Sequence, residues 1–256
     1  MRERPAASPR HNGSARVILA PTLLGLLALA AVLGAALLGG CGSKEGTGPL
    51  NTAPASTSPA PVATTWMQEH SGTDERLNSV TFTDSSHGWA VGDSPIILAT
   101  TDGGATWIKQ DSGQHSGTKL ASVTFTDPSH GWAVGASEDE PTDTESSIIL
   151  ATTDGGEHWT RQHSGRDEVF FSVTFTDPSH GWAVGYSYDV LTDTWSSIIL
   201  ATTDGGATWT KQHSGTDERL NSVTFTDPSH GWAVGGSKDI STHAWSSIIL
   251  AATAGD

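Results

Sequence analysis

The chain has 256 residues and a formal net charge of −15 at pH 7. A chain this acidic lacks the basic surface that binds phosphate, which excludes nucleic acid as a main partner. Its single cysteine excludes an internal disulfide and a zinc site made of cysteines. The 10 Trp and 29 Gly, against only 2 Tyr, indicate a repeated motif that uses Trp and Gly at fixed positions.

The first 40 residues resemble a bacterial export signal. Arginines within residues 1–16 precede an apolar run from Val17 to Leu38, and Gly39-Gly40-Cys41 follows. Basic residues, an apolar stretch and small residues before a cleavage point are typical of secretory signals. Leu-Gly-Gly-Cys is similar to a lipobox, which implies cleavage after residue 40 and a lipid on Cys41. The alternative is an uncleaved membrane helix, because the run is long enough to span a bilayer.

Both interpretations place the remainder outside the cytoplasm, attached to the membrane of the cell envelope, because the arginines stay inside. Residues 41–64 consist mainly of Gly, Ser, Thr, Ala and Pro. A segment of this composition cannot bury a core, so we expect a tether that starts at Cys41. The folded domain is predicted to span residues 65–256.

The predicted domain repeats one pattern four times. His-Gly-Trp-Ala-Val-Gly begins at His87, His130, His180 and His230, with Ser-Val-Thr-Phe-Thr-Asp before each copy and Ile-Ile-Leu-Ala after it. Repeats of about 40–50 residues with several short strands are typical of propellers and solenoids. Alternating apolar and polar residues predict four antiparallel strands in each unit. The sequence therefore predicts an all-β propeller with about four blades.

A further repeated segment, Thr-x-Asp-x-Gly-x-Thr-Trp, resembles the Asp-box, or bacterial neuraminidase repeat. We expect its residues to be structural: the carboxylate and hydroxyl bond the turn, glycine supplies a positive φ, and Trp covers the turn. The matching residues are Asp102, Gly104, Trp107, Asp154, Gly156, Trp159, Asp204, Gly206 and Trp209. With the other repeated segments, the pattern is most similar to the photosystem II stability/assembly factor-like branch of Asp-box propellers.

The domain is expected to begin with a fourth strand and to end with a third strand. The sequence around Trp66 aligns with that around Trp209, so joining the two ends would complete the last blade. The family that the chain resembles commonly closes with seven blades. Two alternatives remain open: a shortened or truncated member of that family, or two chains that join into a larger ring.

The units differ in the loop after their second strand, which is short at 92–95 and long at 136–147, 186–197 and 236–247. These loops and one unrepeated arginine form a candidate binding rim, because exposed aromatic residues beside acids suit a protein or a sugar. The alternative is solvated loops with their aromatic residues folded back onto the blades. The candidate rim residues are Tyr186, Tyr188, Trp195, Trp245, Arg166, Glu138, Asp139, Glu140 and Asp143.

No catalytic residues are predicted. Asp127, Ser129 and His130 have the residue types of a hydrolase triad, but the grouping recurs along the chain and is better explained as turn chemistry. The resemblance to sialidases would require an arginine triad, which the few arginines after residue 41 do not supply. The acidic loops lack EF-hand spacing, so we predict no metal site and no cofactor.

These features predict a non-catalytic scaffold or binding module, lipid-anchored outside the cytoplasm, that engages a membrane complex or an exported protein. Resemblance to photosystem II assembly factors supplies this analogy, and a fold alone does not fix function. The alternative is a module that binds carbohydrate or cell wall through Tyr188, Trp195 and Trp245. A sialidase-like glycosidase is the third interpretation.

Overall fold

The computed structural model describes residues 65–139, 144–238 and 242–253. The chain divides into two units, Met1–Val62 and Ala63–Asp256, and the described residues all lie in the second. The predicted signal, Cys41 and the tether lie outside the described residues. Within the described part of the chain, no helix is long and apolar enough to cross a membrane.

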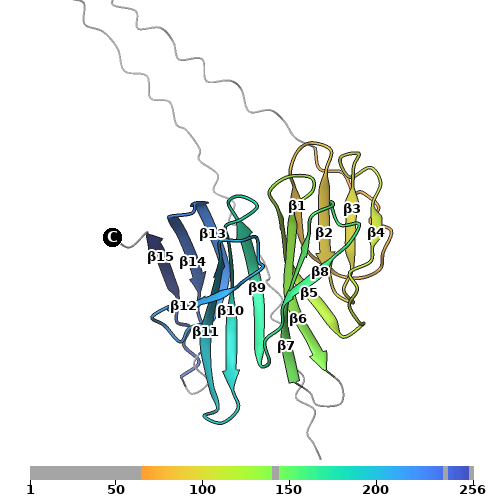
Figure 1. Ribbon diagram of the computed structural model, residues 1–256. Coiled ribbons are helices and arrows are strands. Elements are labelled where there is room, and N and C mark those ends of the chain that lie inside the picture. Colours follow the sequence, from red (N-terminus) through yellow and green to blue (C-terminus); the bar gives the residue numbers. More distant parts are fainter. Residues whose placement is uncertain (1–64, 140–143, 239–241, 254–256) are drawn as a thin grey trace, which may run out of the picture. The chain divides into compact units, whose positions relative to one another are not determined.

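Fifteen strands form four antiparallel sheets in the described residues (Figure 1), and each sheet is one blade. Blade 1 contains β1 (Leu77–Phe82), β2 (Gly88–Gly92), β3 (Ile97–Thr100) and β4 (Ile108–Gln110). Blade 2 contains β5 (Thr118–Phe125), β6 (Gly131–Asp139), β7 (Thr144–Thr152) and β8 (Thr160–His163). Blade 3 contains β9 (Glu168–Phe175), β10 (Gly181–Asp189), β11 (Thr194–Thr202) and β12 (Thr210–Gln212). Blade 4 contains β13 (Leu220–Asp227), β14 (His230–Gly235) and β15 (Ile248–Thr253).

The prediction of an all-β propeller with four-stranded units is confirmed in blades 1 to 3. Strands pair in chain order within each sheet, and the first strands of consecutive blades pack on one another: β1 on β5, β5 on β9 and β9 on β13. Consecutive blades pack face to face, so an inner blade buries apolar residues on both of its faces. Blade 2 shows this result, because Val123, Val134 and Ile149 are all buried.

The core between blades is a stack of aromatic rings. Trp132 on β6 lies parallel to Phe175 on β9, with ring centroids 3.5 Å apart, and the Trp132 indole N–H donates to the carbonyl of Gly205. Gly131 precedes this Trp because a Cβ there would lie 2.2 Å from the Phe125 ring. The repeated His-Gly-Trp segment therefore encodes the packing of one blade on the next.

The Asp-box turns and the turns before the His-Gly-Trp segments lie at the same edge of the blades. In blade 2 the Gly155 N–H donates to the carbonyl of Ser129, which ties the two turns together. The Asp-box itself is held by Thr152, whose hydroxyl donates to Asp154 and accepts from the buried Gly156 N–H. The loops after second strands lie at the opposite edge, which we call the rim.

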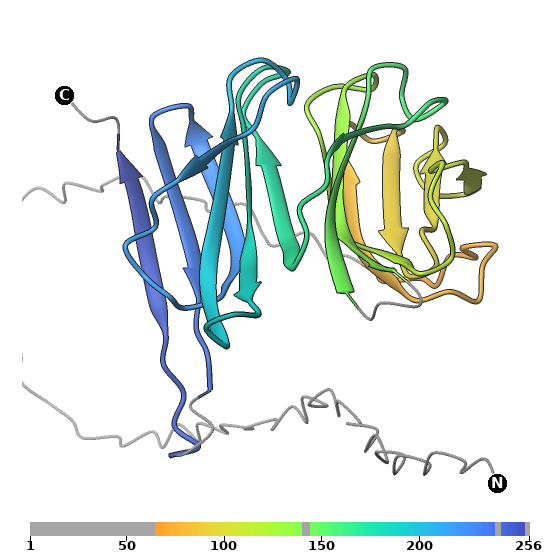
Figure 2. The same ribbon diagram turned by 60° about the horizontal axis from the view of Figure 1, so that its bottom comes forward.

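The fourth blade differs from the expected one. Residues 65–76 contain no strand, Trp66 is exposed, and β15 has no fourth strand beside it. The expectation that the N-terminal segment closes the last blade is therefore not met in the structure. Blades 1 and 4 lie at opposite ends of the row of sheets (Figures 1 and 2), so the segment that precedes β1 is remote from β15.

Candidate functional site

The long loops of blades 2 and 3 are extended hairpins at the rim. β10 and β11 pair without interruption from Gly181↔Thr202 to Asp189↔Thr194, whereas the corresponding β2 and β3 pair only as far as Val91↔Ile97. In blade 4, an isolated bridge between Lys238 and Trp245 continues the hairpin beyond β14. Residues 136–139, 144–147, 186–189 and 194–197, predicted to form loops, thus belong to strands, whose pairing fixes the backbone positions of these residues.

Three of the predicted aromatic residues form one cluster on the hairpin of blade 3. Tyr186 and Tyr188 project from the same face of β10, two residues apart, and the Trp195 ring of β11 contacts both at centroid distances of 4.8 and 4.5 Å. The Arg219 guanidinium lies 4.6 Å from the centroid of the Tyr186 ring and 4.3 Å from that of Trp195. A cation over two rings attaches the start of blade 4 to this cluster.

Tyr186 supports the cluster and is not an exposed contact. Its side chain is buried, and its hydroxyl donates to Oε2 of Glu145 on β7 at 3.0 Å. Burial raises the pKa of Tyr186 far above its ordinary value, and the Glu145 carboxylate adds to the rise. The expectation of an exposed Tyr186 is therefore wrong: the residue remains a neutral phenol that links blades 2 and 3.

An open groove lies between the hairpin of blade 3 and that of blade 4. Its volume is about 760 Å³. Trp195 and Trp245 line it, 41% and 71% exposed, with Phe171 and Arg219 between the two blades. Asp217, Glu218 and Lys238 also line the groove, which gives it both signs of charge beside aromatic surface.

The remaining predicted rim residues lie elsewhere. Glu138 forms an ion pair with Lys119 at 2.9 Å, and Asp139 is the last residue of β6. Arg166 is exposed and bridges Ser146 through the backbone. Glu140 and Asp143 lie outside the described residues. The candidate set therefore divides into an acidic group on blade 2 and an aromatic groove between blades 3 and 4.

Sequence reasoning missed Arg219, Phe171 and Glu218. Arg219 stands at the same repeat position as Arg76, so its own segment of sequence does not distinguish it from a repeated structural residue. The sequence does contain a signal for these residues. In a four-stranded antiparallel blade, the connection after the fourth strand lies at the same edge as the loop after the second strand. Residues that precede β13 therefore reach the groove from blade 4, while the insertion in blade 3 brings Trp195 to meet them.

One exposed trio at the Asp-box edge has metal-ligating atoms close together: Asp154, Glu157 and His158, within 4.8 Å of one another. His158 stands where the other two Asp-boxes have Thr, and its Nδ1 pairs with Asp154 Oδ2 at 2.7 Å. Hydrogen bonds from His158, first from its backbone N–H, hold the pKa of Asp154 well below its ordinary value. The trio thus contains an ion pair that replaces the Thr hydroxyl of the other boxes.

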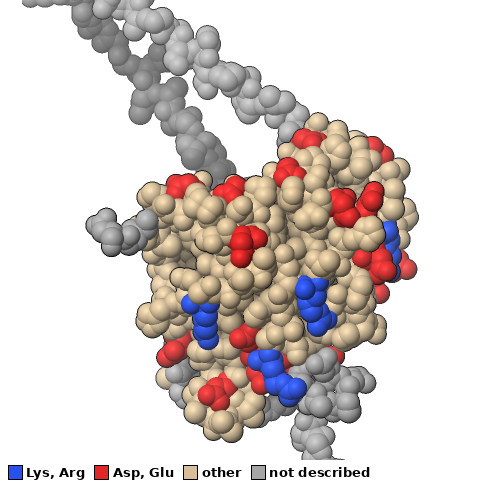
Figure 3. Space-filling model, viewed as in Figure 1, with Lys and Arg blue, Asp and Glu red and all other residues tan. Residues whose placement is uncertain are grey.

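Charge on the surface is predominantly acidic and dispersed. The face in Figure 3 shows Asp and Glu at many places, and Lys and Arg at a few separate ones. In the described residues the remaining arginines belong to different blades: Arg76 precedes β1, Arg161 lies on β8 and Arg219 precedes β13.

Comparison with known proteins gives a family match over part of the chain. Residues 58–167 match the family model described as photosynthesis system II assembly factor YCF48. This segment, less than half of the chain, is similar to photosystem II assembly factors. The photosystem II assembly lipoprotein Ycf48 of Parasynechococcus marenigrum is 45% identical over 53 residues, which are 20% of this chain and 16% of that protein. The chain thus matches only about a sixth of the length of such relatives.

Two solved structures are also similar. A structure described as YCF48 bound to D1 peptide shares 21% identity, covers 75% of this chain and 72% of its own, and has a TM-score of 0.46. The GH74 enzyme of Niastella koreensis shares 14% identity, covers 62% of this chain and 28% of its own, and has a TM-score of 0.44.

Proposed function

We propose that the chain is a non-catalytic binding module of the cell envelope that holds a segment of a membrane protein or another exported protein. A lipid on Cys41 anchors it, and residues 41–64 give the domain reach above the membrane. The groove between blades 3 and 4 receives the partner. This groove is the single observation that carries the proposal.

The groove has the composition of a protein-binding site. Trp195 and Trp245 offer exposed aromatic surface, and aromatic residues and arginine carry much of the free energy of protein association. Arg219 supplies a cation that is already oriented by two rings, so little side-chain entropy is lost on binding. Glu218 and Lys238 can pair with polar groups of a peptide backbone or with charged side chains.

The family match supports this class of partner and the anchor. Relatives of the matched segment are named photosystem II assembly lipoproteins, which is consistent with a lipid-anchored protein that acts on a membrane complex. A scaffold needs a binding surface and no reacting groups.

Affinity capture of the full chain from detergent-solubilised membranes, with mass spectrometry of what is retained, tests the proposal. We expect one membrane or exported protein to be retained, and Trp245→Ala or Arg219→Ala to reduce its recovery by about tenfold or more. Arg76→Ala is the matched control, because Arg76 has the same repeat position but lies outside the groove. Equal recovery with all three variants would contradict the proposal.

A carbohydrate-binding module is the second candidate, and the exposure of both Trp195 and Trp245 in one groove favours it. Indole rings can serve as platforms for the apolar faces of sugars. Binding of cell-wall fragments would then be abolished by Trp195→Ala or Trp245→Ala and would change little with ionic strength. Capture of a protein through charged groups would weaken as salt rises, which separates the two candidates.

A further inference from the structure

The contact between consecutive blades is built three times from the same residues. Trp89 stacks on Phe125, Trp132 on Phe175 and Trp182 on Phe225, with ring centroids 3.5–3.6 Å apart. A backbone bond accompanies each stack: the N–H of Val123, Val173 and Val223 donates to a serine hydroxyl of the preceding blade. Each contact thus joins the face of one blade that carries the stacked Trp, which we call its Trp face, to the face of the next blade that carries the stacked Phe, which we call its Phe face.

Blade 1 exposes a Phe face that no other blade covers in the structure. Leu77, Val80 and Phe82 on β1 correspond to Leu120, Val123 and Phe125 on β5. Val80 is 61% exposed, whereas Val123 is 5% exposed. The residue types are identical at these three positions, so the difference arises only from the absent neighbour.

Blade 4 exposes the complementary Trp face. Trp232, Val234 and Ile249 correspond to Trp132, Val134 and Ile149 of blade 2. Ile249 is 74% exposed, whereas Ile149 is fully buried. The described part of the chain therefore ends in two apolar faces that are the two halves of one contact, already formed three times between the blades.

We propose that these faces join two copies of this chain. Blade 4 of each copy packs on blade 1 of the other, so that Trp232 stacks on Phe82 of the second copy. A contact between different faces closes into a ring or extends without limit. Two copies give eight blades, twice the four sheets described. Propellers typically have about four to eight blades, so two copies close the ring and three would exceed this range.

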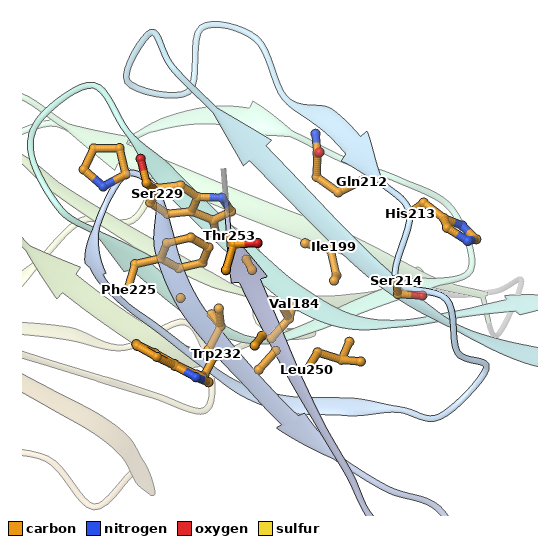
Figure 4. A pocket seen from close by; sticks show the side chains of 17 residues that line it. Val184, Ile199, Gln212, His213, Ser214, Phe225, Ser229, Trp232, Leu250 and Thr253 are labelled. Carbon is orange, nitrogen blue, oxygen red and sulfur yellow. The ribbon is translucent and has the colours of Figure 1, made fainter. Parts of the chain in front are cut away.

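A pocket in blade 4 supports the same arrangement. In blades 1 to 3 the Trp before the fourth strand lies edge-on to the Phe of the first strand: Trp107 to Phe82, Trp159 to Phe125 and Trp209 to Phe175, at 5.9–6.0 Å. Among the described residues no Trp takes this place beside Phe225. A cavity of about 340 Å³ lies there instead, between Phe225, Ile199, Leu250 and Thr253 (Figure 4).

The second copy supplies the missing Trp. Trp66 is 95% exposed and precedes β1 as Trp209 precedes β13. A fourth strand lies in one blade while the first strand that follows it lies in the next. When β1 of the second copy covers blade 4 of the first, the segment around Trp66 of the second copy therefore reaches β15. It pairs with β15 as a fourth strand, and Trp66 enters the cavity beside Phe225.

Light scattering on the full chain in detergent, corrected for bound detergent, tests the proposal. We expect twice the mass of one chain, and half of that mass for Val80→Glu. Ile108→Glu is the matched control and should stay at twice the chain mass, because Ile108 is 68% exposed on β4, away from the proposed contact. One chain mass for the unaltered protein, or a series of masses above two copies, would overturn the proposal.

Engineered cysteines separate a ring of two copies from closure within one chain. Val80→Cys and Ser222→Cys together place thiols at positions equivalent to Val123 and Ser79, where the Val123 N–H donates to the Ser79 hydroxyl at 3.3 Å. We expect a disulfide that links two copies. A disulfide within a single chain would overturn the proposal and indicate a ring of four blades. The variant with both Ser79→Cys and Val123→Cys is the control, because these positions meet within one chain. If this control forms its disulfide and the dimer of the test variant does not, the two copies pair through another surface and the proposal is overturned.

Discussion

At the scale of single residues, the Asp-box is held by one buried hydroxyl. In blade 2 the Thr152 hydroxyl accepts a hydrogen bond from the Gly156 N–H at 2.9 Å and donates to Asp154 at 2.8 Å. Thr152 is buried, and Thr153 beside it is exposed. The side chain that holds the turn can therefore be separated from its neighbour by substitution.

We expect Thr152→Val to lower the free energy of unfolding by about 1–3 kcal/mol, because the buried Gly156 N–H loses its partner. Thr153→Val should change it by no more than about 0.5 kcal/mol, as is usual at an exposed position. Urea unfolding followed by Trp fluorescence measures both values. Equal effects of the two variants would show that the hydroxyl does not hold the turn.

The ion pair of the same box makes its stability depend on pH. The hydrogen bond to Asp154 raises the pKa of His158 above its ordinary value of 6.5. The pair therefore stabilises the folded state fully below pH 6.5, and this stabilisation is lost as pH rises through the folded-state pKa. The lowered pKa of Asp154 has the opposite sign: its contribution is lost only as pH falls through that lowered value, in strong acid.

We expect His158→Thr, which restores the residue of the other two boxes, to remove the loss of stability that is specific to this pair as pH rises from 6.5 through the raised pKa of His158. Urea midpoints of the two proteins across that range measure it. A titration of the His158 ring by nuclear magnetic resonance gives the raised pKa directly. Parallel pH profiles of the two proteins would rule out the linkage.

At the scale of strands and blades, the Trp–Phe stacks decide stability. Phe175 on β9 stacks on Trp132 of blade 2 and lies edge-on to Trp209 of its own blade. We expect Phe175→Ala to cost about 3–5 kcal/mol, as is typical of a large aromatic side chain removed from a core. Leu191→Ala in the hairpin of blade 3 is the control, because Leu191 is almost fully exposed. Denaturant unfolding compares them, and a small loss for Phe175→Ala would show that blade contacts rest on other residues.

The strands themselves could be predicted from the sequence, and the hairpins could not. Alternation in Ser-Val-Thr-Phe and the turn signals that follow are local properties, so blades 1 to 3 were predicted with all four strands. The continuation of β10 and β11 into the predicted loop of blade 3 depends on pairs such as Tyr188 with Trp195. Such cross-strand contacts form only when both sides of the hairpin are present.

At the scale of the whole described domain, the distribution of exposed apolar residues is the unexpected feature. Val80 and Ile249 occupy repeat positions that are buried or partly buried in the other blades, yet they lie on the open faces of the first and last blades. Repeat proteins bury a continuous core by stacking equivalent units, and their end units are the places where this core meets solvent. The mass of the Val80→Glu variant therefore reports how the ends of this array are covered.

The sequence by itself determined the repeat, the class of fold and the strands of blades 1 to 3, because these are encoded locally and written several times. It also brought Tyr188, Trp195 and Trp245 to one edge. The tertiary structure alone decided which aromatic residues of the rim are exposed: it buried Tyr186 against Glu145 and placed Arg219 over two rings. Those contacts join three blades, and distances between blades depend on packing that no single repeat encodes.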